Sequence, residues 1–124
     1  MKTIMLLGEC STNTLKLQLY FDGQQERTLL YSAPDLNMLQ LNPDALVLEV
    51  QERFDLRHWL PRLRMRWNVP ILLLASRLDR EQVVELLDLG ADDCIYKPAE
   101  PREVRAHLNA LWRRYPLLNP SQPT

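Results

Sequence analysis

The sequence predicts an α/β fold, a doubly wound five-stranded parallel sheet of the (βα)5 type. Short apolar runs alternate along the chain with longer stretches whose apolar residues recur at helical spacing. The short runs are apolar on both faces, which is typical of parallel strands covered by helices on both sides. Strands that alternate with helices in this way imply right-handed crossovers and a layered α/β domain.

The five expected strands are four to six residues long and rich in Leu, Ile and Val. In chain order they cover residues 4–7, 28–31, 45–50, 71–74 and 93–96. Pro70 stands just before the fourth strand, where its missing N–H costs little. The lengths are ordinary for strands in globular proteins.

Four of the intervening stretches predict helices, at residues 12–21, 59–67, 79–89 and 101–114. Asp79 followed by Gln82 predicts a capping box at the start of the third of these. Gly90 stands where a helix end favours positive φ, and Pro101 suits the first position of the last helix. The segment 34–42 is short for a helix, so we expect one or two turns there.

Length and composition indicate a soluble cytoplasmic domain. The chain has 124 residues, enough for one domain with a core, and its formal net charge is −1. That charge excludes a bulk attraction to nucleic acid or to an anionic membrane. No apolar run approaches the ~20 residues that span a bilayer, and the N-terminal run is too short for a signal peptide. The two cysteines, Cys10 and Cys94, are too few for a disulfide framework or a zinc site.

The last ten residues differ in composition from the rest of the chain. Residues 115–124 are rich in proline and polar side chains, which is typical of a linker. We therefore expect a domain over residues 1–114 followed by a linker-like tail. A linker to a second domain and a free C-terminus would look the same at this point.

Two motifs in the C-terminal half carry a resemblance to a known family. Residues 70–77 read Pro-Ile-Leu-Leu-Leu-Ala-Ser-Arg, and residues 89–98 read Leu-Gly-Ala-Asp-Asp-Cys-Ile-Tyr-Lys-Pro. With the helix from Pro101, this half closely resembles response-regulator receiver domains, most of all those of the winged-helix transcription-factor class. The resemblance spans residues 2–114 and is strongest over 70–114. It implies a flavodoxin-like sheet with strand order 2-1-3-4-5 and, before Pro98, a peptide bond that is usually cis.

The family resembled works by phosphoryl transfer to an aspartate at the end of the third strand. Acidic residues hold Mg²⁺ there, and a lysine and a hydroxyl bind the phosphoryl oxygens. An aromatic side chain then turns inward and alters the face formed by the helix 79–89, the fifth strand and the last helix. In the order first acid, second acid, nucleophile, hydroxyl, switch aromatic and lysine, these positions hold Gly8, Glu9, Glu49, Ala75, Cys94 and Lys97.

Most of these positions have changed, so the resemblance implies a degenerate pocket, or pseudo-receiver. Lys97 is unchanged and Glu9 is a conservative match. The extra methylene of Glu49 moves its carboxylate by about 1.5 Å, and in-line transfer is sensitive to misplacement of ~1 Å. Ser76 follows Ala75 but should point to the other side of the strand. We expect no catalytic residue and no enzymatic activity.

The degenerate pocket leaves three functions open. The first is an atypical receiver in two-component, phosphorelay-type signalling. It would act independently of phosphorylation and control an attached DNA-binding output domain by dimerising. The second is a stand-alone adaptor that docks on a signalling protein, and the third is a phosphotransfer domain that uses Glu49. We expect a plain Glu49–Lys97 salt bridge in preference to a Glu49 that mimics an active state. We expect no cofactor, with weak binding of Mg²⁺ by Glu9 and Glu49 as the remaining possibility.

Two surfaces are candidates for partners. A basic concentration on the helix 59–67 and just before it favours a solvated face, with an acidic partner as the alternative; it comprises Arg53, Arg57, His58, Arg62, Arg64 and Arg66. The resemblance also implies homodimerisation through the face of the helix 79–89, the fifth strand and the last helix. The residues expected on that dimer face are Val83, Asp92, Asp93, Glu103, His107 and Arg114. Val83 and His107 stand where basic partners are usual, so the interface should be weaker or more hydrophobic.

Overall fold

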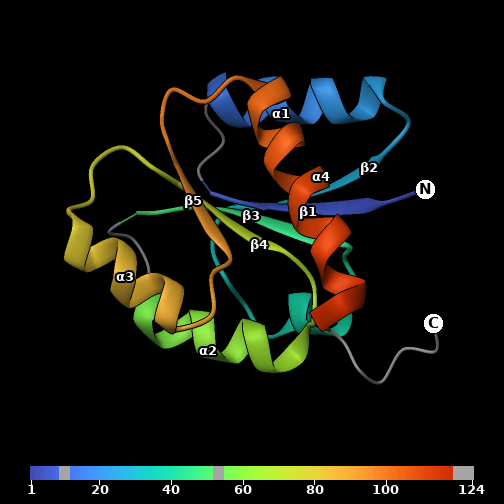
Figure 1. Cartoon of the computed structure of the whole chain (residues 1–124). Coiled ribbons are helices and arrows are strands. Elements are labelled where there is room, and N and C mark those ends of the chain that lie inside the picture. The colour runs from blue at the N-terminus through green and yellow to red at the C-terminus, as the bar shows by residue number, and fades with distance from the viewer. Residues whose placement is uncertain (9–11, 52–54, 119–124) are drawn as a thin grey trace.

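Five parallel strands form one sheet in the order β2-β1-β3-β4-β5, with helices on both faces (Figure 1). The computed structural model describes residues 1–8, 12–51 and 55–118. The strands are β1 (Thr3–Leu7), β2 (Arg27–Tyr31), β3 (Ala45–Glu49), β4 (Ile71–Ala75) and β5 (Asp93–Tyr96). The predicted fold class and strand order are confirmed.

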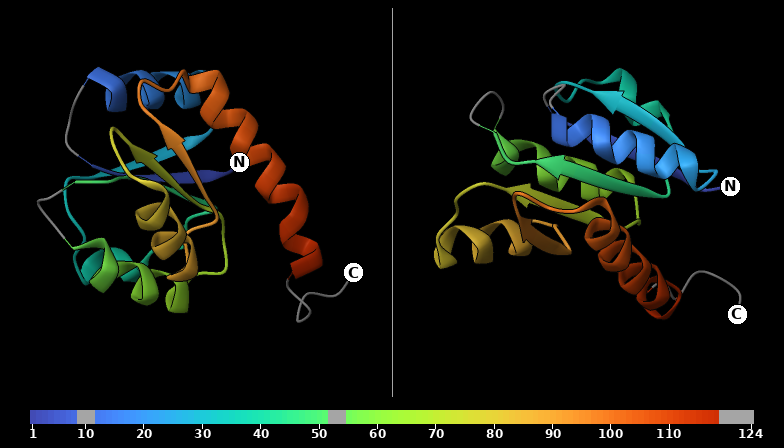
Figure 2. Two further views of the ribbon diagram at one scale, coloured as in Figure 1. Left: turned by 60° about the vertical axis from the view of Figure 1, so that its left-hand side comes forward. Right: turned by 90° about the horizontal axis from the view of Figure 1, so that it is seen from above.

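Two helices cover each face of the sheet (Figures 1 and 2). Helices α1 (Thr12–Gly23) and α4 (Pro101–Leu118) pack on one face, where Phe21 and Leu108 are fully buried. Helices α2 (Leu56–Arg66) and α3 (Arg80–Asp88) pack on the other, where α2 contributes the fully buried Leu60 and Leu63. Because β3 and β4 lie between these two clusters, all five residues of each are buried. This double coverage accounts for the apolar character of their sequences.

The connection from β2 to β3 holds a short 3-10 helix, η1 (Asn37–Gln40), in place of an α-helix. The Asp35 carboxylate accepts a hydrogen bond of 2.9 Å from the backbone N–H of Met38, and the Met38 side chain is fully buried. The expectation of one or two turns over 34–42 is therefore confirmed. The chain has four α-helices in its described residues, so the (βα)5 pattern is complete in strands and one helix short.

The predicted helix-terminal signals are found in the structure. Asp79 and Gln82 make the capping box of α3, Gly90 has φ of +132°, and Pro101 is the first residue of α4. The Lys97–Pro98 peptide bond is cis. Among the described residues, no helix combines the length and the apolar character needed to cross a bilayer.

Two helix boundaries differ from the sequence-based expectation by three residues or more. Helix α2 begins at Leu56, three residues early, because the Asp55 carboxylate caps it by accepting a 3.0 Å hydrogen bond from the Arg57 backbone N–H. Helix α4 runs four residues past Arg114, and Tyr115, which composition had assigned to the tail, packs against the sheet edge. The remaining residues of that tail, 119–124, lie outside the described part of the chain.

Candidate functional site

A carboxylate, an ammonium and a hydroxyl meet at the carboxyl-terminal edge of the sheet. Glu49 ends β3, and its Oε2 lies 2.7 Å from the Nζ of Lys97, which directly follows β5. The Thr14 hydroxyl, in the first turn of α1, donates to Oε1 of Glu49 at 2.6 Å. Only 7% of Glu49 is exposed, so this carboxylate is buried with a cation on one oxygen and a hydroxyl on the other. The predicted Glu49–Lys97 salt bridge is present.

Gly8 makes room for this arrangement. A Cβ placed on Gly8 would lie 2.7 Å from both Cγ and Oε1 of Glu49, and 2.8 Å from its Cδ. These distances are well below van der Waals contact, so any larger residue at position 8 would displace the glutamate. The long acid at position 49 therefore fits because position 8 has no side chain. The backbone N–H of Gly8 donates to the carbonyl of Tyr31 at 2.8 Å, which fixes the end of β1.

The two positions where the family has a hydroxyl and a switch aromatic hold Ala75 and Cys94. Ala75 is fully buried at the end of β4, and Ser76 is exposed, in agreement with strand alternation. Cys94 is a free thiol, partly buried against the core on the α2–α3 face. Burial, and then the nearby Asp93 carboxylate, raise the pKa of the Cys94 thiol. Cys94 therefore behaves as a small core side chain with little thiolate character.

The described residues do not fit a magnesium site. Mg²⁺ prefers several oxygen ligands in octahedral geometry, usually including one or two carboxylates. Gly8 offers no carboxylate, and Lys97 already neutralises Glu49. No group of three or more metal-ligating side chains occurs among residues 1–8, 12–51 and 55–118. Glu9, the other predicted ligand, and Cys10 lie outside the described residues.

Thr14 was not predicted as a site residue. A threonine near the start of a helix is usually read as a local capping residue, because its hydroxyl often bonds to a nearby backbone group. Here the hydroxyl reaches a side chain 35 positions away. The one feature of the sequence that pointed to Thr14 is its place in the first turn of a helix that starts beside the pocket. That place does not distinguish a local capping residue from a partner of Glu49.

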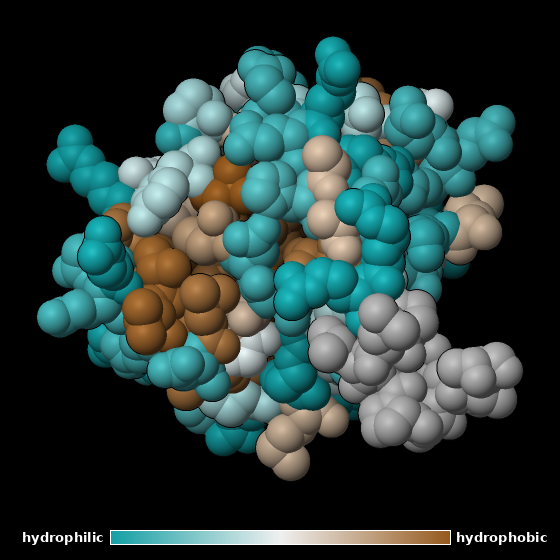
Figure 3. Space-filling model, in the orientation of Figure 1, coloured by the Kyte–Doolittle hydropathy of each residue, from teal (hydrophilic) through white to brown (hydrophobic). Residues whose placement is uncertain are grey.

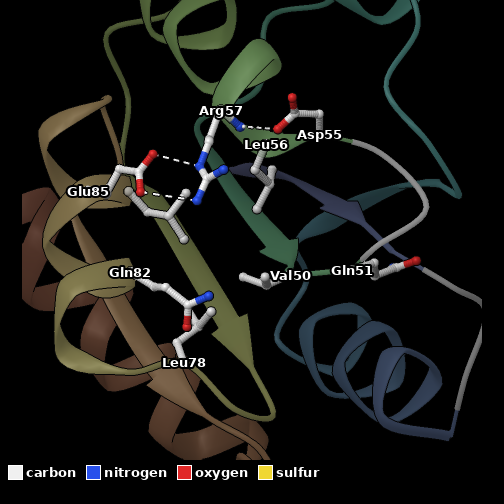
Figure 4. A pocket seen from close by; sticks show the side chains of 9 residues that line it. Val50, Gln51, Asp55, Leu56, Arg57, Leu78, Gln82 and Glu85 are labelled. Atoms are coloured by element: carbon white, nitrogen blue, oxygen red, sulfur yellow. Dashed lines mark hydrogen bonds and ion pairs between the residues drawn. The ribbon is translucent and has the colours of Figure 1, made fainter.

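The basic concentration on α2 is largely engaged within the chain. Arg57 forms a two-point ion pair with Glu85 of α3, at 2.6 and 3.2 Å, and this pair bridges one side of a groove of about 460 Å³ (Figure 4). Arg64 is bonded to backbone carbonyls and to Asp92, and Arg66 donates to the carbonyl of Leu39 at 2.6 Å. Of the remaining members, His58 and Arg62 are exposed, while Arg53 lies outside the described residues. Arg57 and Arg66 are exposed despite these bonds, so the predicted solvated face agrees with the structure at four of its five described members.

Two of the acids expected on the dimer face have partners inside the chain. One oxygen of Asp92 accepts hydrogen bonds from Arg64, from the backbone N–H of Ile71 and from Tyr115. Asp93 Oδ2 lies 2.6 Å from Nδ1 of His107 on α4. The other predicted members differ in exposure: Glu103 and Arg114 are exposed, and Val83 is half-buried.

An apolar patch lies beside these acids. Val84 and Leu87 on α3 are 51% and 37% exposed, and Tyr96 at the end of β5 is 50% exposed. Figure 3 shows hydrophobic side chains gathered over α3, framed by hydrophilic ones. We call Val83, Val84 and Leu87 the α3 patch. Large exposed apolar areas of this kind often mark contact surfaces.

The fold and the position of the pocket match those of receiver domains, and comparison with known proteins finds the same similarity. Over 75 residues, 60% of this chain, it is 43% identical to the sensory transduction protein BceR of Bacillus subtilis. Over 74 residues it is 39% identical to the response regulator protein GraR of Staphylococcus epidermidis. The matched segments are 32% and 33% of those proteins, so the chain spans about a third of their length. No protein-family model matches the chain.

Solved structures agree on the fold. A two-component response regulator from Clostridium difficile superposes with a TM-score of 0.81 at 19% identity, covering 92% of this chain and 98% of that one. A CheY-like receiver domain from Methanospirillum hungatei gives a TM-score of 0.85 at 13% identity, covering 96% and 99%. The chain therefore has the fold of response-regulator receiver domains, and about 60% of its length is similar in sequence to response regulators.

Proposed function

We propose that this receiver domain works without accepting a phosphoryl group, and that it controls an attached DNA-binding output domain by dimerising. The observation that carries the first part is the closed Glu49 carboxylate. One oxygen is paired with Lys97 and the other accepts from Thr14. Attack by Glu49 on a phosphodonor would require at least one of these short contacts to break inside a buried site, which is costly.

The surroundings of Glu49 also lack what a transferred phosphoryl group needs. In receiver chemistry a lysine, a hydroxyl and Mg²⁺ share its oxygens. Here Ala75 replaces the hydroxyl, and Lys97 is already paired with Glu49. A phosphoryl group at this position would therefore be poorly held and would lack the contact from the end of β4 that transmits its presence in the family.

Intact-mass spectrometry tests this proposal directly. The protein is incubated with acetyl phosphate and Mg²⁺, and the expected result is no adduct of about 80 Da, the mass of one phosphoryl group. Glu49→Asp should behave in the same way, since Gly8 and Ala75 are still unsuited to the chemistry. A phosphorylated Glu49, or a phosphorylated and dimer-switched Glu49→Asp protein, contradicts the proposal.

The α3 patch supports the second part of the proposal. Because Asp92 and Asp93 are already bonded within the chain, a dimer on the α3–β5–α4 face would depend on apolar burial more than on charged pairs. Dimerisation should therefore change little between 0.1 and 0.5 M salt, in contrast to an interface of exposed ion pairs. Strictly monomeric behaviour at high concentration in analytical ultracentrifugation would exclude this mode of action.

Variants on two apolar surfaces distinguish a specific dimer interface from non-specific hydrophobic association. Leu87→Lys lies in the α3 patch and should abolish self-association. Leu19→Lys, on α1, is the matched control because Leu19 is an exposed leucine at 73% on the opposite face of the sheet. If both variants weaken association equally, the α3 patch is not the interface.

A further inference from the structure

Arg64 is the centre of a hydrogen-bond cluster at the amino-terminal edge of β4 and β5. Its Nε and Nη2 donate to the carbonyl of Gly90 at 3.0 and 2.8 Å. Its Nη1 donates to the carbonyls of Trp67 and Val69 at 3.2 and 2.9 Å, and Nη2 also donates to Asp92 at 2.7 Å. These five bonds use all five donors of a guanidinium. The cluster therefore has a rigid centre that is independent of α4.

Tyr115, in the last turns of α4, docks on this cluster. Its hydroxyl lies 2.6 Å from Oδ2 of Asp92 and 2.7 Å from the carbonyl of Val69, both as possible acceptors of its one hydrogen. Burial, and then the hydrogen bond to Asp92, raise the pKa of the Tyr115 hydroxyl above its ordinary range. The tyrosine therefore stays protonated and remains a donor at any physiological pH.

Both Asp92 and the upstream part of α4 keep other hydrogen bonds when the contact with Tyr115 opens. If Tyr115 leaves, Asp92 keeps its bonds from Arg64 and from the backbone N–H of Ile71, so no buried charge is left unpaired. Upstream on α4, Trp112 Nε1 still donates to the carbonyl of Asp44 at 2.8 Å and holds the rest of the helix. Opening at Tyr115 is therefore a local event, confined to the end of α4.

We propose that Tyr115 is a latch: when docked it holds the end of α4 on the sheet edge, and its release frees the last turn of that helix. This inference rests on the proposed function in one respect, since control of a following segment gives the latch its use. The contact lies within the chain. The phenol hydroxyl of Tyr115 lies against the Asp92 carboxylate, which is already paired with the guanidinium of Arg64. It also gives Asp92 a role inside the domain in place of the dimer contact that the sequence suggested.

Hydrogen exchange measured by mass spectrometry on the full chain tests the latch. Tyr115→Phe removes only the hydroxyl, and a hydrogen bond to a charged group is worth about tenfold or more in an equilibrium. We expect amide exchange over residues 113–118 to quicken about tenfold, with exchange in β1, β3 and β4 unchanged. Tyr96→Phe is the matched control, because the Tyr96 hydroxyl donates to the carbonyl of Leu78 at 3.2 Å at the other end of β5.

Two results would overturn the latch. Exchange over 113–118 that stays within twofold of the wild type would mean that the hydroxyl does not hold the helix end. Faster exchange throughout the sheet in Tyr115→Phe would mean a general structural role. A spectrophotometric titration gives a second readout, because the tyrosinate signal that appears last at high pH should vanish in Tyr115→Phe and persist in Tyr96→Phe. Neither measurement depends on whether Glu49 accepts a phosphoryl group, so the two proposals fail separately.

Discussion

We expect substitutions at Gly8 and Glu49 to have coupled effects on the free energy of unfolding, and Gly8→Ala tests this coupling. The added Cβ would lie 2.7 Å from the Cγ and Oε1 of Glu49. Glu49 cannot simply turn away, because Thr14 and Lys97 hold its two oxygens at 2.6 and 2.7 Å. The alanine must therefore either strain the end of β1 or break a buried contact.

The magnitude follows from the two ways of relieving the clash. Overpacking a buried position costs about 1–3 kcal/mol, and breaking a buried ion pair by loss of one partner costs about 3–5 kcal/mol. Gly8→Ala should take the cheaper route and destabilise the protein by about 2–3 kcal/mol. In a Glu49→Ala background the same change places a methyl group in space that the glutamate has left, so it should cost less than about 0.5 kcal/mol or stabilise the protein.

Urea denaturation followed by tryptophan fluorescence measures all four proteins of this double-mutant cycle. The expected coupling between positions 8 and 49 is about 2 kcal/mol, with the double variant more stable than additivity predicts. An unchanged m-value is required, so that midpoints can be compared as stabilities. If Gly8→Ala costs less than 0.5 kcal/mol in the wild type, or if the two changes simply add, the packing argument for the closed pocket is wrong.

Three further predictions concern the pocket and its surroundings. Thr14→Val should destabilise the fold by about 1–2 kcal/mol in thermal or urea unfolding, because Oε1 of Glu49 loses its donor, whereas Thr14→Ser should keep most of the stability. Lys97→Met should cost about 3 kcal/mol at pH 7, and the loss should shrink when Glu49→Gln removes the charge left unpaired. Cys94 should react with iodoacetamide at pH 8 more slowly than a free thiol, as peptide mapping can measure, because its pKa is raised. The raised pKa of Cys94 also links folding stability to pH. Stability should fall as pH rises above the ordinary thiol pKa near 8.5, because the thiol ionises first in the unfolded chain.

The sheet was predictable because burial acts on each strand locally. β3 and β4 are covered by helices on both faces, and their unbroken apolar sequences record this directly. Helix ends were predictable where a cap is local, as at Asp79 and Gly90. The start of α2 was missed by three residues, although its cap at Asp55 is also local, because the charged first turn hid the apolar spacing.

The pocket was predictable in its members and not in its geometry. The resemblance identified Gly8, Glu49 and Lys97, and the structure brings all three together. It could not identify Thr14, whose bond to Glu49 depends on the exact placement of α1 over the end of β3. Gly8 and Glu49 fit each other because one has lost a side chain and the other has a longer one. In the sequence, these two changes appear only as two unrelated departures from the family pattern.

Charged residues were the least predictable part, because a sequence does not record whether a charge faces solvent or a partner. Arg64 looked like one member of a basic face, and Asp92 like a contact for a second copy of the chain. In the structure they are bonded to each other at 2.7 Å, with Tyr115 on the same carboxylate oxygen. Because Asp92 and Asp93 are engaged inside the domain, the exposed apolar side chains Val84 and Leu87 become stronger candidates for an outside contact on this face. The internal pairing of these two acids and the closed Glu49 carboxylate both support the proposed function, in which contacts with a partner depend on packing.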